Sequence, residues 1–221
     1  MKAVSIALAV VCFVSCPAYA THLMLADFDS GEKPNNVGGN FGAWDKDPED
    51  FTQAAWEEFN TDDTRQGTGY CMMVEYDVDS PNPAYNGFWI QFEGMDASAY
   101  DTLSMWVKTD EVKGGASRFK IELKTAGERG AYYLEGISSE WTQFKIPLFD
   151  FLISDYSELW EMVIVFEDHT ASPKEGFVYI DDIALENSED QATEEPVEAA
   201  PAEEILPIDS EDAEADDSTS E

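Results

Sequence analysis

The chain has 221 residues, which suggests one domain of ordinary size, and its composition of 43% hydrophobic and 13% aromatic residues is sufficient for a sizeable core. It has 47 acidic and 12 basic side chains, giving a formal net charge of -35. Such a charge repels phosphate backbones and anionic lipid headgroups, so nucleic acid is excluded as an expected partner, whereas cations, neutral polymers and basic proteins stay open.

Residues 1–20 have the pattern of a cleavable signal peptide. Lys2 provides the positive start, and the apolar run that follows is too short to span a bilayer. Ala18 and Ala20 are the small residues that signal peptidase reads. We therefore expect the protein to be exported, to the periplasm or the extracellular space, with Thr21 as its first mature residue.

The cysteines allow a second interpretation of this leader. Val14-Ser15-Cys16 is a partial lipobox, which would make Cys16 a lipid-anchored N-terminus. Cys12 also lies in the leader, so that only Cys71 remains after cleavage at Ala20. An exported domain without a disulfide must be stabilised by its core or by a metal ion.

Residues 21–186 show the pattern of an all-β domain. Short runs of alternating apolar and polar residues recur, separated by Gly, Pro, Asn and Asp. This pattern predicts a two-sheet antiparallel β-sandwich, or jelly roll, and no long amphipathic helix. We expect a long connection at 34–44, with a glycan-facing loop as the alternative, and a short helical turn at 154–160. Strands are expected at 23–28, 51–59, 70–78, 87–92, 102–109, 118–125, 131–136, 142–147, 162–167 and 177–185.

Alternation along the strands predicts which side chains face the core. One phase is apolar, and we assign it to the core: Phe88, Ile90, Phe92, Leu103, Met105, Val107, Phe119, Ile121 and Leu123. The opposite phase is mostly polar, yet it includes two tryptophans: Trp89, Gln91, Trp106, Lys108, Arg118, Lys120 and Glu122. Tryptophan on a polar phase is unusual and indicates a binding surface.

Residues 187–221 differ sharply from the domain. They are rich in Asp and Glu and contain no Lys, Arg or aromatic residue, and three prolines interrupt the segment. Such a sequence cannot bury enough apolar surface to offset the entropy of ordering. It predicts a disordered acidic tail, which could also bind a protein partner.

Four segments in order resemble a known family. They are Leu25-Ala26-Asp27-Phe28-Asp29, residues 100–108 (YDTLSMWVK), residues 141–148 (WTQFKIPL) and residues 178–185 (VYIDDIAL). This series is similar to the galactose-binding-domain-like jelly rolls, above all to carbohydrate-binding modules of the family 11 type. The resemblance covers nearly all of the predicted domain and implies a concave sheet that binds a glycan chain.

The same resemblance implies a structural calcium ion near the chain ends. The matching positions are Asp29, where the family often has Glu, and Asp182, flanked by Asp27 and Asp181. Backbone carbonyls around residues 66–68 are expected to add ligands. Oxygen ligands converging from separate segments are what calcium requires, although strand-end acids are also common without a metal. Calcium joining the first and last strands would replace the missing disulfide.

Sugar recognition combines aromatic rings that stack on pyranose faces with polar groups that bind hydroxyls. Both types occur on the polar phase and in nearby segments. The predicted carbohydrate site contains Trp89, Trp106, Gln91, Arg118, Lys120, Glu122, Tyr85 and Tyr133. The alternative for each tryptophan is that it packs beneath a covering loop.

The sequence favours a binding protein over an enzyme. No pair of carboxylates is singled out for glycoside hydrolysis; Glu122 and Glu135 are the best candidates. We therefore expect an exported, non-catalytic module for a neutral, β-glucan-like polysaccharide. The alternative is a structural or interaction protein that keeps the jelly roll without sugar binding and meets a partner through its acidic tail or surface.

Overall fold

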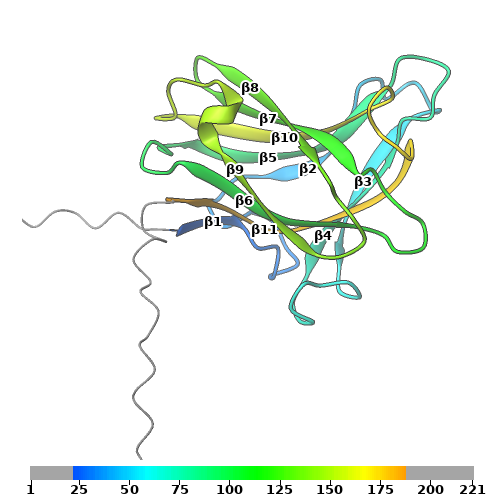
Figure 1. Cartoon of the computed structure of the whole chain (residues 1–221), viewed down its shortest axis with the longest axis horizontal. Coiled ribbons are helices and arrows are strands. Elements are labelled where there is room, and N and C mark those ends of the chain that lie inside the picture. The colour runs from blue at the N-terminus through cyan, green and yellow to red at the C-terminus, as the bar shows by residue number, and fades with distance from the viewer. Residues whose placement is uncertain (1–21, 188–221) are drawn as a thin grey trace, which may run out of the picture.

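The computed structural model describes residues 22–187, which form two packed antiparallel β-sheets and one short 3₁₀ helix (Figure 1). The predicted signal peptide (1–20), the lipobox alternative at Cys16 and the predicted acidic tail beyond Asn187 lie outside the described residues. Within them, the prediction of an all-β, two-sheet sandwich is confirmed.

The five-stranded sheet, called the front sheet below, has the order β2-β5-β10-β7-β8. All of its neighbouring strands are antiparallel. Its strands are β2 (Phe41–Asp45), β5 (Tyr85–Met95), β10 (Leu159–Glu167), β7 (Arg118–Thr125) and β8 (Arg129–Glu135).

The six-stranded sheet, called the back sheet below, has the order β3-β4-β11-β6-β9, and β1 pairs with β11. Its strands are β3 (Ala54–Asn60), β4 (Cys71–Asp77), β11 (Glu175–Glu186), β6 (Thr102–Thr109), β9 (Thr142–Pro147) and β1 (His22–Ala26). The first and last strands of the domain therefore lie side by side (Figure 1).

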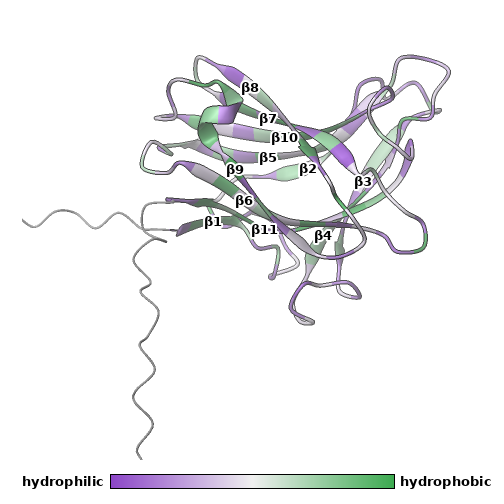
Figure 2. Ribbon diagram, viewed as in Figure 1, coloured by the Kyte–Doolittle hydropathy of each residue, from purple (hydrophilic) through white to green (hydrophobic). Residues whose placement is uncertain are grey.

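The core lies between the sheets, and the strands alternate between hydrophobic and hydrophilic residues along their length (Figure 2). All nine residues predicted to face the core are at most 1% exposed. Tyr76 of the back sheet and Phe166 of the front sheet stack with ring centroids 4.0 Å apart. The assignment of the core face from strand phase is thus confirmed for β5, β6 and β7.

Two local predictions are wrong. The expected connection at 34–44 ends in strand β2, because Phe41 inserts into the core at 1% exposure while the strand pairs with β5. The helical turn expected at 154–160 is absent; Asp155 caps a turn there by accepting a hydrogen bond from the Ser157 N–H at 2.9 Å. The 3₁₀ helix η1 instead covers Leu148–Phe151.

Among residues 22–187, no helix is long and apolar enough to cross a membrane. Cys71 is a buried free cysteine, and burial raises the pKa of its thiol to about 12. It packs with Phe177 and Tyr179 in a small apolar cluster on the back sheet. This thiol is therefore a packing group rather than a nucleophile.

Candidate functional site

The outer face of the front sheet has a low centre built from small and β-branched residues. Trp89 on β5 lies opposite Gly42 on one side and Val163 on the other. Val163 lies opposite Glu122, and Glu122 lies opposite Ala131. Small neighbours in this row leave the Trp89 indole and the Glu122 carboxylate as the groups that rise above the sheet.

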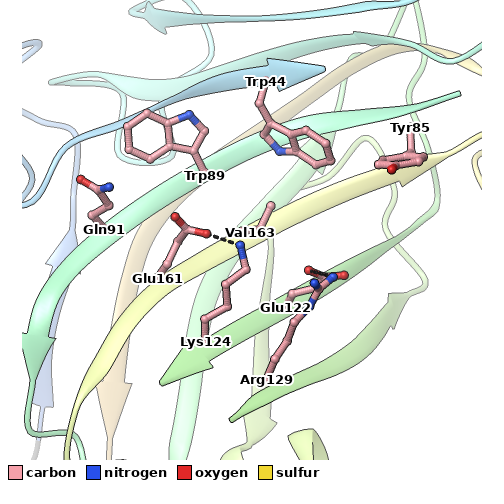
Figure 3. Close-up of a pocket in the computed structure, with 9 residues that line it drawn as sticks. All are labelled: Trp44, Tyr85, Trp89, Gln91, Glu122, Lys124, Arg129, Glu161 and Val163. Atoms are coloured by element: carbon pink, nitrogen blue, oxygen red, sulfur yellow. Dashed lines mark hydrogen bonds and ion pairs between the residues drawn. The ribbon is translucent and has the colours of Figure 1, made fainter. Parts of the chain in front are cut away.

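A pocket of ≈ 480 Å³ occupies this face and spans all five strands (Figure 3). Three aromatic rings lie along β2 and β5, and charged groups of β7, β8 and β10 lie across from them, with Val163 between (Figure 3). The lining residues are Trp44, Tyr85, Trp89, Gln91, Glu122, Lys124, Arg129, Glu161 and Val163. The pocket is thus a trough along β10 with an aromatic side and a charged side.

The aromatic side consists of Tyr85, Trp44 and Trp89. Trp44 and Tyr85 meet edge to face, with ring centroids 5.8 Å apart, and the Lys46 ammonium lies 5.2 Å from the Tyr85 ring centre. Tyr85 is 41% exposed. Within the described part of the chain, the buried Trp44 Nε1 has no hydrogen-bond partner. An unpaired indole N–H is costly, and a ligand oxygen that reached it would remove the cost.

The charged side is a chain of ion pairs centred on Glu122, which is only 5% exposed. Its carboxylate accepts Arg129 at 2.5 Å and Lys120 at 3.2 Å. Lys124 forms a further ion pair with Glu161 on β10. Because each of these charges has an opposite partner, this face is nearly neutral although the chain as a whole is strongly acidic.

A second group of polar residues extends this side beyond the pocket. Glu167 accepts Lys120 Nζ at 2.5 Å and the Tyr133 hydroxyl at 2.9 Å, while the Arg118 guanidinium lies 4.4 Å from the centre of the Tyr133 ring. Burial lowers the pKa of Lys120, but its hydrogen bonds to Glu167 and Glu122 outweigh burial and raise the pKa above its ordinary value. Lys120 is therefore held fully charged.

Seven of the eight predicted sugar-site residues share this outer face: Trp89, Gln91, Tyr85, Arg118, Lys120, Glu122 and Tyr133. Trp106 does not. It lies on β6 in the back sheet, opposite Asp181 of β11, beneath the Arg65 guanidinium at 4.8 Å from the ring centre. Placing both tryptophans on one platform is therefore wrong, because strand phase tells which side of a strand a residue faces but not to which sheet the strand belongs.

The sequence prediction missed five residues of the pocket. Trp44 was placed in a connection, because the segment FGAW follows a run of turn formers and is too short to show the alternation of a strand. Lys124 shares the phase of Lys120 and could have been included. The other three residues were harder to find. Arg129 and Glu161 lie just before the predicted strands 131–136 and 162–167, and Val163 only forms the floor of the pocket.

The four predicted calcium ligands do not form one ready site. The Asp27 carboxylate accepts a hydrogen bond from the side-chain amide of Asn36 at 2.7 Å. Asp181 and Asp182 lie at an irregularity in β11, and Asp182 is ion-paired with Arg65. Burial first, and then the neighbouring Asp182 carboxylate, raise the pKa of Asp181 to about 7.

Asp29 lies close to the same group, with its carboxylate against the backbone of Gly69. Among residues 22–187, however, no three carboxylate, histidine or cysteine side chains are grouped closely enough to hold a metal ion. The residues as arranged do not fit calcium unless Arg65 moves away from Asp182. Calcium thus stays a prediction.

Solved structures with this architecture are known. A family 11 carbohydrate-binding module of the cellulase Lic26A-Cel5E of Clostridium thermocellum aligns with 77% of this chain and 97% of its own, at a TM-score of 0.57 and 18% identity. A family 11 module from the same organism, solved in complex with a β-1,3-1,4-mixed-linked tetrasaccharide, aligns with a TM-score of 0.58, also at 18% identity, over 77% of this chain and 98% of its own. The fold is that of the family 11 carbohydrate-binding modules.

The likeness is one of structure rather than sequence. No protein-family model and no curated protein matches the sequence. An exo-β-agarase also aligns, with a TM-score of 0.54 and 13% identity, over 75% of this chain and 25% of the agarase. The resemblance to family 11 modules predicted from four short segments is confirmed at the level of the fold.

Proposed function

We propose that this protein is a non-catalytic carbohydrate-binding module that holds a neutral, β-glucan-like polysaccharide in the pocket of the front sheet. The observation that carries the proposal is the pairing of an aromatic side with a charged, hydrogen-bonding side across one trough. Aromatic rings bury the apolar faces of pyranoses, and fixed polar groups bind their hydroxyls. The mixed-linked tetrasaccharide bound by a module of the same fold supports this ligand class.

The distribution of charge favours an uncharged ligand. A formal charge of -35 repels polyanions at long range, and the basic groups of the pocket are already paired with carboxylates. An acidic polysaccharide would have to compete with Glu122 and Glu161 for these groups. Sugar hydroxyl groups can instead form hydrogen bonds with the remaining donor and acceptor positions of the paired side chains, without separating the ion pairs.

The carboxylates are arranged for binding rather than for hydrolysis. Glu122 is ion-paired with two basic side chains and Glu161 with one, so neither carboxylate is free to act on a glycosidic bond as arranged. Glu135, the other candidate for a hydrolytic pair, is ion-paired with Arg118 at 3.0 Å. We therefore propose that the bound glycan is held and released unchanged.

Calorimetric titration of the protein with a panel of soluble polysaccharides tests the proposal. We expect binding to mixed-linkage β-glucan or another neutral glycan, no binding to polyuronates, and no release of reducing ends on long incubation. Failure to bind any neutral polysaccharide would remove the proposal and leave the interaction-protein alternative. Export, which the residues of the leader suggest, forms part of the proposal because polysaccharides of this kind lie outside the cell.

A further inference from the structure

Trp160 is an exposed tryptophan at the end of the pocket that neither the predicted site nor the pocket itself includes. It is 47% exposed, whereas its neighbour Leu159 is completely buried in the core. On its other side, Glu161 lines the pocket. Since Leu159 faces inward and Glu161 faces outward, the half-exposed Trp160 belongs to the outer face, directly beyond the pocket.

A local irregularity of the front sheet turns Trp160 outward. Between Leu159 and Glu161 the register with β7 advances by one residue, from Thr125 to Lys124, so that Trp160 is the extra residue of a bulge. On the opposite side, β5 also departs from regular pairing, with Glu93 and Gly94 at φ of 57° and 71°. Bulges of this kind re-aim a side chain, and here two adjoining strands are irregular at the same level.

The indole of Trp160 is seated on Gly94. A Cβ at this glycine would lie 2.8 Å from Cζ2 and 2.9 Å from Cε2 of the indole, which is closer than packed atoms approach. The positive φ of Gly94 also favours glycine over any residue with a side chain. One side of the ring is therefore supported by backbone while much of the rest faces solvent, which is the arrangement of a stacking platform.

Trp160 continues the aromatic side of the pocket. It lies three positions before Val163 on β10, a distance of about 10 Å, and Val163 lies opposite Trp89. The trough runs along β10, so a chain lying on Trp89 and leaving the pocket past Glu161 passes over Trp160. Tyr85, Trp44, Trp89 and Trp160 thus follow one another along the strand direction.

We propose that Trp160 forms an additional subsite that stacks on a sugar residue of a long glucan chain beyond the pocket. This inference rests on the proposed function and adds a dependence on chain length. A disaccharide held at Trp89 lies within the pocket without reaching Trp160, whereas a longer chain contacts both.

The test is calorimetry with a disaccharide and an octasaccharide of β-glucan. We expect Trp160→Ala to weaken octasaccharide binding about tenfold and to change disaccharide binding less than about twofold, because the contact it removes is worth about 1.4 kcal/mol. Trp160→Phe, which keeps an aromatic ring, should recover most of the loss. The matched control is Trp56→Ala, since Trp56 is 57% exposed on β3 of the back sheet.

The outcomes separate the two proposals. Equal binding of the octasaccharide by wild type and Trp160→Ala overturns the subsite and leaves the proposed function intact. Equal weakening of both oligosaccharides also overturns it, because Trp160 would then act on the pocket itself. If wild type binds neither sugar, the proposed function and the subsite fall together.

Discussion

The indole of Trp89 lies over the backbone of Gly42, so close that a Cβ at this glycine would be 3.3 Å from Cζ2 of the ring. The two residues are directly opposite each other on β5 and β2. The edge strand contributes no side chain at this point, and its backbone supports one part of the ring while another part lines the pocket. The orientation of the Trp89 indole, the proposed main stacking group, thus depends on the absence of a side chain on the neighbouring strand.

Gly42→Val should therefore displace the Trp89 indole and weaken glucan binding about tenfold, which corresponds to about 1.4 kcal/mol. The fold should survive, because the atoms nearest to the new side chain belong to the side chains of Trp89 and Glu57 and not to the backbone. Titration calorimetry and circular dichroism measure the two effects. Gly127→Val is the matched control, since nothing lies within 4 Å of a Cβ there. Unchanged affinity in Gly42→Val would show that the ring position is not critical.

Trp89→Ala should reduce the affinity for a soluble β-glucan by about 2 kcal/mol or more, as expected for an aromatic residue at the centre of a binding site. Its stability should fall by less than the roughly 3 to 5 kcal/mol typical of a fully buried aromatic residue, because the ring lines the pocket. Chemical denaturation measures this loss of stability.

The contrasting variant is Trp106→Ala. Trp106 packs beneath Arg65 on the back sheet, so this variant should lose stability and keep its affinity for glucan. A loss of binding in Trp106→Ala with unchanged stability would contradict the assignment of the site to the front sheet.

Sequence patterns predicted the sandwich because alternation is a local property of each strand. Phe88, Ile90 and Phe92 must share one face whatever the topology, and the structure confirms that they lie in the core. The same reasoning placed Trp89 and Gln91 correctly on an outer face. It could not show that Trp106 belongs to the other sheet, because the assignment of strands to sheets depends on pairing between distant segments.

The residues missed at the site have a related cause. Trp44 reaches the pocket only because β2, a strand of five residues, pairs with β5 after a segment rich in turn formers. Trp160 is turned outward by a bulge, which interrupts the alternation on which the assignment of faces relies. Both aromatic residues are thus placed by long-range pairing that no local pattern records.

Glu167→Gln should make the domain less stable at neutral pH by about 1.5 to 3 kcal/mol, the usual range for hydrogen bonds to charged groups. Burial tends to raise the pKa of this carboxyl, but hydrogen bonds from Lys120 and Tyr133 outweigh it, so the pKa is lowered below its ordinary value. A lowered pKa means that the ionised form stabilises the fold. This stabilisation is complete above the unfolded pKa near 4.5 and is lost as the pH falls through the folded value.

Denaturation of wild type and Glu167→Gln between neutral and acidic pH measures this dependence. The difference in unfolding free energy should shrink as the pH falls below about 4.5. Glu158→Gln is a suitable control, because Glu158 is an exposed glutamate in the turn directly before β10, the strand that ends at Glu167. A difference that stayed constant down to the acid limit would show that the ion pair with Lys120 contributes nothing to folding.

Calcium should raise the melting temperature of the protein if the carboxylates at the chain ends bind it as predicted. Burial first, and then the carboxylate of Asp182 and that of Asp29, raise the pKa of Asp181 to about 7, so a cation bound beside Asp181 would favour its ionised form. Bound calcium would stabilise the fold by about 2.7 kcal/mol at a hundredfold excess over Kd. Melting in calcium and in chelator provides the comparison, and Asp182→Ala should abolish the response.

Arg65 and calcium would compete for the carboxylate of Asp182. Its guanidinium is ion-paired with Asp182 and lies over the Trp106 ring, so calcium must displace it. Arg65→Ala should therefore lower stability in chelator and enlarge the calcium response, because the cation no longer competes for Asp182. If Arg65→Ala and wild type both melt identically with and without calcium, no calcium site exists, and Arg65 is the permanent counter-ion that holds Asp182.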